Sequence, residues 1–392
     1  MASPERSGII GYDSFHFVVE NLERSRKFYT KMLDFKEVAR AGNELVERSG
    51  QESVVFGAGD VRVCVSTPLA PQSKAARYGK RHPSGVMSLS FRVENLAQTE
   101  AYLDKRGATF LSEPLELKDA HGGTYRQFEI ATPLGEVAFR FVERSDFQPF
   151  APGFVDVGTG NASKPANLFG ITAIDHITSN GLTMQPIVAW YRDVLGFEPF
   201  WEISFHTHDV AKERASGSGL RSIVMWDPVS GVKFATNEPL KPLFRESQIW
   251  KFVDDNHGAG IQHIAFAVPN IIATVEDLAK RGVDFMQTHP AYYRDLPGRL
   301  ATLGIHNVKE ELATLERLQI LVDGANDKYM LQIFMREAKT LYDDSRAGPF
   351  FYEIIQRAGD EGFGYGNFRA LFESIERAQQ ALDAASVRDG KA

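Results

Sequence analysis

Cysteine is almost absent from this sequence. The single one among 392 residues is Cys64, which excludes an internal disulfide and any zinc or redox site built from a pair of cysteines. Long apolar runs are also missing: no stretch approaches the roughly 18 apolar residues of a membrane span, and the first residues lack the apolar core of a secretory signal. We therefore expect a cytoplasmic protein that has no membrane partner.

Positive charge is not concentrated anywhere along the chain. The 44 Lys and Arg residues are outnumbered by 51 Asp and Glu residues, which gives a net charge of -7, and no long basic run occurs. Binding to nucleic acid requires a dense positive surface, so we expect no nucleic-acid partner. The length of 392 residues suits about two to three globular domains.

What the sequence does contain is an internal repeat. A predicted strand that includes His16 precedes a helical pattern of apolar residues over 28–33. A predicted strand that includes His176 precedes the same apolar spacing over 190–195. The two segments therefore predict the same local structure at two places in the chain.

A second pair of segments repeats as well. Residues 86–107 match residues 261–282, and in both a strand leads into a helix that ends on Lys-Arg-Gly, which suits a helix C-terminus. A further short strand is predicted after each helix, over 109–111 and 284–286. The chain therefore consists of two homologous halves, each built from two modules of a strand, a helix and more strands.

Pro, Gly and Asn residues with little periodicity separate the two halves. We predict an N-terminal half over 1–155, a linker over 156–169 and a C-terminal half over 170–392. Helical spacing of apolar residues near the C-terminus predicts a final amphipathic helix that begins at Asn367. The expected fold class is α+β, with two tandem halves.

The two halves differ at the positions of candidate metal ligands. Ser88 in the first half corresponds to His263 in the second, and Arg140 corresponds to Glu353. A guanidinium group cannot be a ligand of a divalent cation. The first half therefore lacks two of the candidate metal ligands.

His176, which we match to His16, completes the candidate set in the second half. Together with His263 and Glu353 it offers two imidazoles and one carboxylate, and a set of this kind leaves other coordination positions open. Such an arrangement suits a non-haem Fe(II) that binds substrate and O₂, although zinc or manganese fits the same ligands.

Other histidines are weaker candidates. His206 and His208 alternate on a predicted strand and are the rival pair, but no repeat supports them, and the Gly/Ser-rich segment 216–219 favours an exposed loop end. The remaining ones adjoin Pro, Gly or Asn and are expected in loops: His82, His121, His257, His289 and His306.

Several stretches of the second half carry a resemblance to a known family. They are 175–176, 219–222, 237–239, 247–249, 258–263, 292–293, 331–334, 350–357 and 362–368. Through them the second half resembles the 4-hydroxyphenylpyruvate dioxygenase family over essentially its whole length. The paired modules resemble the vicinal oxygen chelate superfamily, which implies that each half is a pair of βαβββ modules forming an open barrel.

The resemblance also implies a function and a site. It implies an Fe(II) enzyme that converts the small molecule 4-hydroxyphenylpyruvate and O₂ to homogentisate and CO₂ in tyrosine and phenylalanine breakdown, as a homo-oligomer. The family's iron ligands correspond to His176, His263 and Glu353. Its catalytic residues correspond to Gln248, Gln262 and Gln332. Its substrate-binding residues correspond to Ser222, Asn237, Gln248, Phe334, Phe351, Phe363, Asn367 and Phe368.

The C-terminal helix is expected to be a lid over this pocket, with Gly362, Gly364 and Gly366 as candidate hinges. Simple packing of its apolar face into the core is the alternative. Two positions depart from the family pattern, Tyr352 beside the ligand glutamate and 250–251 after Gln248, and neither change removes a ligand.

Three other functions stay open at this point. A 4-hydroxymandelate synthase has the same substrate and ligands but oxidises the benzylic carbon. An extradiol ring-cleaving dioxygenase also uses two histidines and a glutamate. A binding protein of the same superfamily sequesters its ligand without chemistry and needs no metal ligands.

Overall fold

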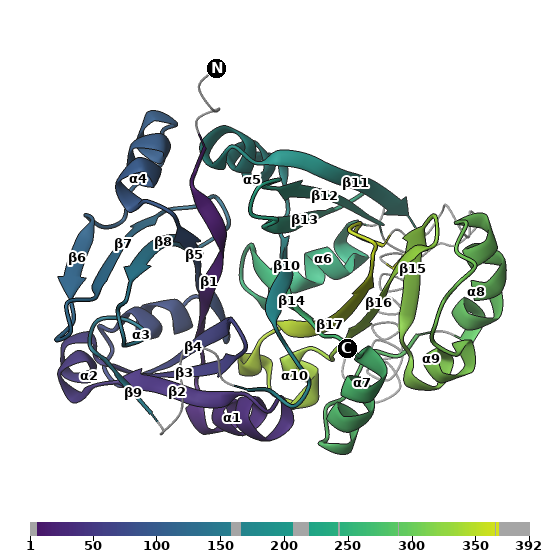
Figure 1. Ribbon diagram of the computed structural model, residues 1–392, viewed down its shortest axis with the longest axis horizontal. Helices are drawn as coiled ribbons and strands as arrows, with labels where there is room; N and C mark the ends of the chain where they lie inside the picture. Colours follow the sequence, from purple (N-terminus) through teal and green to yellow (C-terminus); the bar gives the residue numbers. More distant parts are fainter. Residues whose placement is uncertain are drawn as a thin grey trace.

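The structure is a computed structural model that describes residues 6–157, 166–206, 219–241, 244–288, 290–364 and 366–367. Two curled β-sheets lie side by side, the first drawn in purple to blue and the second in teal to yellow (Figure 1). In chain order, the first half contains β1 (Ile9–Val18), α1 (Leu22–Lys27), a π-helical turn (Phe28–Met32), β2 (Lys36–Ala41), α2 (Asn43–Ser49), β3 (Gln51–Ala58), β4 (Val61–Pro68), α3 (Lys74–Gly79), β5 (Gly85–Val93), α4 (Leu96–Lys105), β6 (Leu115–Lys118), β7 (Thr124–Ile130), β8 (Ala138–Ser145) and β9 (Phe154–Asp156).

The second half repeats this order with additional helices. It contains β10 (Ala173–Asn180), α5 (Gln185–Trp190), a π-helical turn (Tyr191–Leu195), β11 (Glu198–His206), β12 (Gly219–Trp226), β13 (Lys233–Pro239), a 3₁₀ turn (Phe244–Glu246), α6 (Gln248–Asp255), β14 (Gly260–Ala267), α7 (Ile271–Lys280), α8 (Pro290–Thr302), α9 (Leu312–Leu318), β15 (Leu321–Ala325), β16 (Lys328–Phe334), α10 (Ala338–Leu341), a 3₁₀ turn (Ser345–Ala347) and β17 (Phe351–Ala358). None of the helices that the structure describes is long and apolar enough to cross a membrane.

The strand order shows the module duplication directly. It is β6-β7-β8-β5-β1-β4-β3-β2-β9 in the first sheet and β11-β12-β13-β10-β14-β17-β16-β15 in the second. The first strands of the two modules pair antiparallel at the centre of each sheet, β1 with β5 and β10 with β14. Each of these strands also pairs in parallel with the last strand of its own module. The predicted α+β architecture of paired modules is therefore confirmed.

The repeated helices α4 and α7 have the same ends because the sequence repeats there. Asn95 and Asn270 precede them, and each side chain accepts a hydrogen bond from a backbone N–H of the first turn. Gly107 and Gly282 follow them with φ of 79° and 88°, a left-handed conformation that glycine adopts without strain. The prediction of a strand after each helix, over 109–111 and 284–286, is wrong, because Phe110 and Phe285 make only isolated β-bridges there.

Two β-bulges recur at the same places in both halves. On β1 the extra residue is Asp13, and on β10 it is Asp175. On β5 the extra residue is Met87, and on β14 it is Gln262. The bulges therefore align the central strand pair of one half with that of the other, residue by residue.

This alignment corrects the match of His16 to His176 that was predicted from the sequence. Ser14 follows the bulge on β1 and His176 follows the bulge on β10, so these two residues are equivalent. His16 is equivalent to Thr178, because His16 pairs with the residue after the β5 bulge and Thr178 pairs with the residue after the β14 bulge. The prediction that His16 and His176 occupy the same place is therefore wrong by two residues. Alternating apolar residues cannot reveal this offset, since a two-residue shift preserves the face of the sheet.

Two predicted segments fall partly outside the description. Residues 158–165 of the linker predicted over 156–169, and residues 368–392 of the predicted C-terminal helix, lie outside the described residues, so the domain boundaries stay a prediction. Asp323 of β15 accepts hydrogen bonds from the backbone N–H groups of Gly366 and Asn367, at 2.5 and 3.4 Å. This buried carboxylate therefore fixes the chain just before the predicted helix.

The two halves share a packed aromatic interface. Tyr29 of the first half and Tyr352 of the second are 3% and 4% exposed, and their hydroxyl oxygens lie 2.6 Å apart in a hydrogen bond. The Tyr352 ring also stacks on Phe28 and on Phe266. Tyr352 alternates with Glu353 along β17, so its side chain points away from the metal ligand and towards the first half. The departure from the family pattern at this position is thus a contact between the halves.

We predict that Tyr352→Phe lowers the free energy of unfolding by about 1–3 kcal/mol, because it leaves the Tyr29 hydroxyl buried without its partner. The double variant Tyr29→Phe/Tyr352→Phe removes both hydroxyls and should be less destabilised than the sum of the single variants. Urea denaturation of the three variants measures the coupling. Additive losses would show that the hydroxyl pair contributes nothing.

Candidate metal centre

Three buried ligand groups meet on one face of the second sheet. His176 comes from β10, His263 from β14 and Glu353 from β17, which are neighbouring strands. Their ligand atoms all lie within 4.8 Å of one another, and the residues are 1–3% exposed. Oε2 of Glu353 is 3.2 Å from Nε2 of His176 and 3.4 Å from Nε2 of His263. The structure therefore brings the three predicted ligands together.

The two bulges orient the two imidazoles. A bulge allows neighbouring side chains to turn to the same side of a sheet, which regular alternation forbids. The bulge residue Asp175 places Oδ1 2.8 Å from Nδ1 of His176, and the bulge residue Gln262 places Oε1 3.2 Å from Nδ1 of His263. A proton on each Nδ1 leaves the Nε2 lone pair free for a metal. Both histidines are thus presented as ligands by the residue before them.

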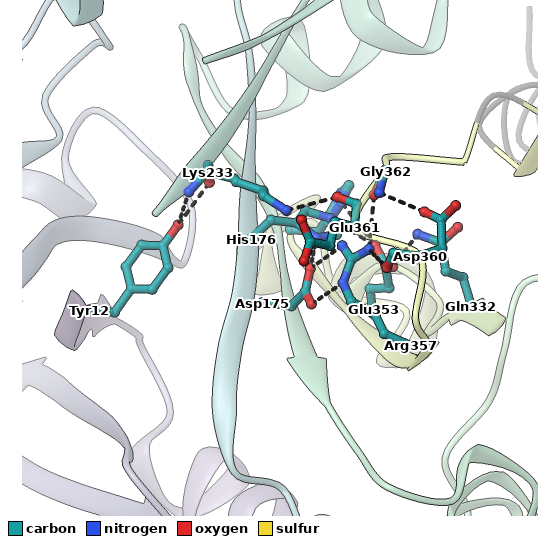
Figure 2. A network of polar contacts seen from close by, with 11 residues as sticks. Tyr12, Asp175, His176, Lys233, Gln332, Glu353, Arg357, Asp360, Glu361 and Gly362 are labelled. Carbon is teal, nitrogen blue, oxygen red and sulfur yellow. Dashed lines mark hydrogen bonds and ion pairs between the residues drawn. The ribbon is translucent and has the colours of Figure 1, made fainter. Parts of the chain in front are cut away.

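A buried ion pair supports this arrangement from behind. Arg357 donates from Nε and Nη2 to the two carboxylate oxygens of Asp175, at 2.7 Å each (Figure 2). The same guanidinium donates from Nη1 to the carbonyl oxygens of Asp360 and Gly362, at 2.9 Å each. Arg357 therefore connects a metal-facing histidine to the turn that precedes the predicted lid.

The electrostatics of the site couple its groups. Burial lowers the pKa of a histidine, but the carboxylates of Glu353 and Asp175 outweigh this effect and raise the pKa of His176 to about 9. Burial raises the pKa of a carboxyl, but His176 and His263 lower the pKa of Glu353 to about 2. Burial lowers the pKa of His263, and Glu353 offsets only part of that shift. Glu353 is therefore ionised, and a divalent cation can take over the positive charge that a proton supplies on His176.

The donor set fits a first-row metal ion. Ligand atoms held at right angles about 2.1 Å from a metal lie about 3 Å apart, which is close to the spacings between Glu353 and the two histidines. Two imidazoles and a carboxylate on one side leave the other side for exogenous ligands. The residues present thus suit a bound metal ion in a buried site.

A chain of amides holds the third ligand. The Gln332 side chain donates from Nε2 to Oε1 of Glu353 at 2.7 Å, which leaves Oε2 directed at the histidines. Asn367 donates in turn to Oε1 of Gln332 at 2.9 Å, and Tyr292 donates to Asn367 at 2.8 Å. Gly364, with φ of 70°, passes so close that an added Cβ would lie 2.9 Å from Oε1 of Gln332. Gln332 was predicted to be catalytic and Asn367 to bind substrate. In the structure, Gln332 holds Glu353 in position and Asn367 holds Gln332.

Other predicted pocket residues bring buried polar atoms without partners to the same half. Ser222 pairs with Asn237 across β12 and β13, and both are at most 2% exposed. Within the described part of the chain, Oγ of Ser222, Oδ1 of Asn237 and Oε1 of Gln248 have no hydrogen-bond partner. Buried polar atoms normally find partners, so this group points to a ligand or water that satisfies them.

Aromatic rings surround the two histidines. Phe351 stacks on His263 with ring centroids 4.9 Å apart, and Phe334 lies 6.0 Å from the same ring. Phe363 lies 4.5 Å from the ring of His176. The predicted walls Phe334, Phe351 and Phe363 therefore line the ligand histidines, whereas Phe368 lies outside the described residues.

Sequence reasoning missed the roles of several supporting residues. Asp175 and Arg357 stand in stretches that resemble the family, but nothing in their spacing indicates an ion pair, and Asp323 carried no signal. Of the rival histidines, His206 ends β11 and His208 lies outside the described residues. His82 is in a loop, as predicted, but it is 6% exposed, and its Nδ1 lies 2.7 Å from the carbonyl oxygen of Asn256 in the other half.

Comparison with known proteins agrees with the duplicated fold. The sequence matches the Glyoxalase/Bleomycin resistance protein/Dioxygenase superfamily over residues 11–137 and 173–296, one segment in each half. Among solved structures, a mutant of 4-hydroxymandelate synthase from Streptomyces coelicolor has a TM-score of 0.77 at 24% identity, covering 95% of this chain and 99% of that one. This likeness shows a shared fold.

Curated relatives are similar over nearly the whole chain. The 4-hydroxyphenylpyruvate dioxygenase of Dictyostelium discoideum is 35% identical over 375 residues, which cover 94% of this chain and 98% of the relative. The 4-hydroxyphenylpyruvate dioxygenase of Yarrowia lipolytica is 35% identical over 378 residues, covering 94% of this chain and 92% of the relative. Similarity of this extent means that the chain belongs to the 4-hydroxyphenylpyruvate dioxygenase family of enzymes.

Proposed function

We propose that this enzyme is an Fe(II)-dependent dioxygenase that converts 4-hydroxyphenylpyruvate and O₂ to homogentisate and CO₂. The observation that carries the proposal is the buried set His176, His263 and Glu353, in the half that also contains buried polar atoms without a hydrogen-bond partner among the described residues. The family membership of the chain supports the choice of substrate. The CO₂ carries away the two oxygen atoms of the substrate's carboxylate, so both atoms of O₂ enter homogentisate and the reaction balances.

Iron is the metal that this reaction requires. When bound, Fe(II) provides adjacent open positions at which a 2-oxo acid is chelated and O₂ is activated. In this proposal His176, His263 and Glu353 hold the metal, and Asp175 and Gln262 keep the two imidazoles in the correct orientation. The substrate supplies its own 2-oxo acid group, so no separate organic cofactor is needed.

The pocket residues have distinct tasks in this proposal. Ser222, Asn237 and Gln248 are neutral, so they can bind the phenol of the substrate without repelling its carboxylate. The rings of Phe334 and Phe363 flank the metal ligands and exclude water while they position the aromatic ring. Phe351, Asn367 and Phe368 complete the proposed substrate site.

Catalytic roles for Gln262 and Gln332 follow from the groups that they contact. Each amide is in contact with a metal ligand, Gln262 with His263 and Gln332 with Glu353. We propose that these glutamines act by positioning ligands, whereas Gln248 contacts the substrate. The predicted C-terminal lid, with Gly362, Gly364 and Gly366 as hinges, belongs to the same proposal.

We also propose that the enzyme works as a homo-oligomer in the cytoplasm. The edge strand β6 is exposed along its length, and Leu115 and Leu117 are 39% and 40% exposed there. An open strand edge that carries apolar side chains suits pairing with a second copy. The single Cys64 is buried and unpaired, which suits a reducing compartment.

The product decides the reaction type. Turnover of 4-hydroxyphenylpyruvate by the Fe(II)-loaded enzyme should give homogentisate, with one CO₂ released for each O₂ consumed. Mass spectrometry and NMR of the product, together with an oxygen electrode, measure both quantities. Exclusive formation of 4-hydroxymandelate would refute ring hydroxylation, and catechol turnover without CO₂ would indicate ring cleavage.

Loss of a ligand should abolish activity without unfolding the chain. We expect His263→Ala and Glu353→Ala to lose Fe(II)-dependent O₂ uptake, because two protein ligands hold the metal too weakly. The matched control is Ser88→Ala, which changes the position equivalent to His263 in the first half and should leave O₂ uptake unchanged. Circular dichroism confirms that the variants fold. Normal turnover by His263→Ala would contradict the proposed ligand set.

The carboxylate behind His176 should control iron affinity. We expect Asp175→Asn to weaken Fe(II) binding about 10–100-fold, the usual effect of losing the partner of a ligand histidine. Asp13→Asn is the control, because Asp13 forms the equivalent ion pair with Arg144 in the half whose described residues contain no group of metal ligands. Competition with a metal-binding dye measures both affinities. Equal losses in the two variants would mean that the effect is general destabilisation.

A further inference from the structure

The first half contains a cavity of its own. It has a volume of about 450 Å³, within the range of about 300–1,000 Å³ that small-molecule sites occupy. Apolar side chains form part of its wall, among them Leu45, Met87, Phe150 and Phe154. Nothing in the proposed dioxygenase reaction uses this space.

The cavity lies at the position that the metal centre has in the second half. Ser88 follows the β5 bulge as His263 follows the β14 bulge. Arg140 stands two residues beyond the partner of Ser88 on β8, as Glu353 stands two residues beyond the partner of His263 on β17. Ser88 and Arg140 both line the cavity. The duplicated fold therefore has a second concave site at which metal ligands are replaced by a hydroxyl and a cation.

The first half also has polar side chains at positions equivalent to those of the proposed substrate pocket in the second half. Ser53 and Ser66 form a cross-strand pair on β3 and β4, as Ser222 and Asn237 do on β12 and β13. The Oγ atoms of Ser53 and Ser66 lie 2.6 Å apart in a hydrogen bond. Ser53 lines the cavity. The first half thus keeps hydrogen-bonding side chains where the second half has its proposed phenol-binding group.

The charge of the lining favours an anion. Arg140 donates from Nε and Nη2 to Oε1 of Glu129, at 3.0 and 2.5 Å, and Lys74 donates to Oε2 at 3.3 Å. One carboxylate is therefore shared by two cations. The other carboxylate of the lining, Glu136, forms an ion pair with Arg81. The wall keeps positive charge that its own carboxylates do not balance.

A buried hydroxyl in the lining lacks a partner. Ser88 is 2% exposed, and its Oγ makes no hydrogen bond within the described part of the chain. His16 is committed elsewhere, because its Nε2 lies 2.6 Å from Oγ of Ser66. Burial and the nearby Arg140 lower the pKa of His16 to about 3, so this ring is neutral and leaves the positive charge to the cations. An unpartnered buried hydroxyl that lines the same cavity as a guanidinium is a group that a ligand can satisfy.

We propose that this cavity is a second, non-catalytic binding site for a small organic monocarboxylate that has an apolar body. Arg140 and Lys74 attract the carboxylate of the ligand. Among the described residues, Glu129 accepts hydrogen bonds from Nε and Nη2 of Arg140, which leaves Nη1 for the ligand. The Ser88 hydroxyl adds a hydrogen bond. The apolar wall covers the rest of the molecule. The site needs no metal, so its occupancy is independent of the iron reaction.

Binding of 4-fluorophenylacetate to the full-length, iron-loaded protein under anaerobic conditions tests the proposal. Isothermal titration calorimetry gives the number of sites, and ¹⁹F NMR distinguishes their environments. The test variant is Arg140→Gln/Glu129→Gln, which removes the cation and its partner together and so leaves no buried charge unpaired. The matched control is Arg126→Gln/Glu116→Gln, which removes an exposed ion pair on the neighbouring strands β6 and β7.

The test variant should bind one molecule fewer per chain than the wild type, or bind it at least tenfold more weakly, while its O₂ uptake stays unchanged. The control variant should match the wild type. Ser88→Leu extends a side chain into the cavity and should lose the same site and the same ¹⁹F signal. Equal stoichiometry and affinity in the wild type and in both cavity variants would overturn the proposal, as would a wild type that binds no probe at all.

Discussion

The ionised carboxylate of Glu353, 1% exposed between two imidazoles, is the group on which the rest of the second half depends. Burying a charge of this kind costs several kcal/mol unless partners surround it. Gln332 binds one carboxylate oxygen, and the two histidines or a metal bind the other. Each histidine needs its own acceptor at Nδ1, and Arg357 in turn neutralises Asp175. The network therefore extends outward from one carboxylate until it reaches the turn before the predicted lid.

Beta-bulges make this network possible. Regular alternation sends neighbouring side chains to opposite faces of a strand, so a histidine and the residue before it could not share a site. The bulges at Asp175 and Gln262 remove that restriction at the two histidines. The same bulges occur at Asp13 and Met87 in the first half, where no metal ligand follows them. The bulges are therefore part of the duplicated backbone. The candidate metal ligands of the second half use a backbone feature that the first half also has.

The sequence predicts the fold well because duplication and helix ends are local signals. The repeated Lys-Arg-Gly ends and the pairing of modules agree with the structure, and the three predicted ligands meet. The match of His16 to His176 failed because a shift of two residues along a strand leaves the alternating apolar pattern unchanged. The role of Tyr352 could not be predicted either, since its partner Tyr29 is more than 300 residues away along the chain. Contacts of this range depend on how the two halves pack.

The two halves show how one backbone holds opposite charges at the same position. Arg140 takes the place of Glu353, and Glu129 on the adjacent strand provides the carboxylate that the guanidinium needs. The ion pair of Asp13 with Arg144 remains in the first half, equivalent to that of Asp175 with Arg357, although no metal ligand requires it there. This pair must therefore have a structural role, which is to fasten the bulged strand to the last strand of the neighbouring module. In the second half the same ion pair, already in place for stability, also orients the histidine that faces the metal site.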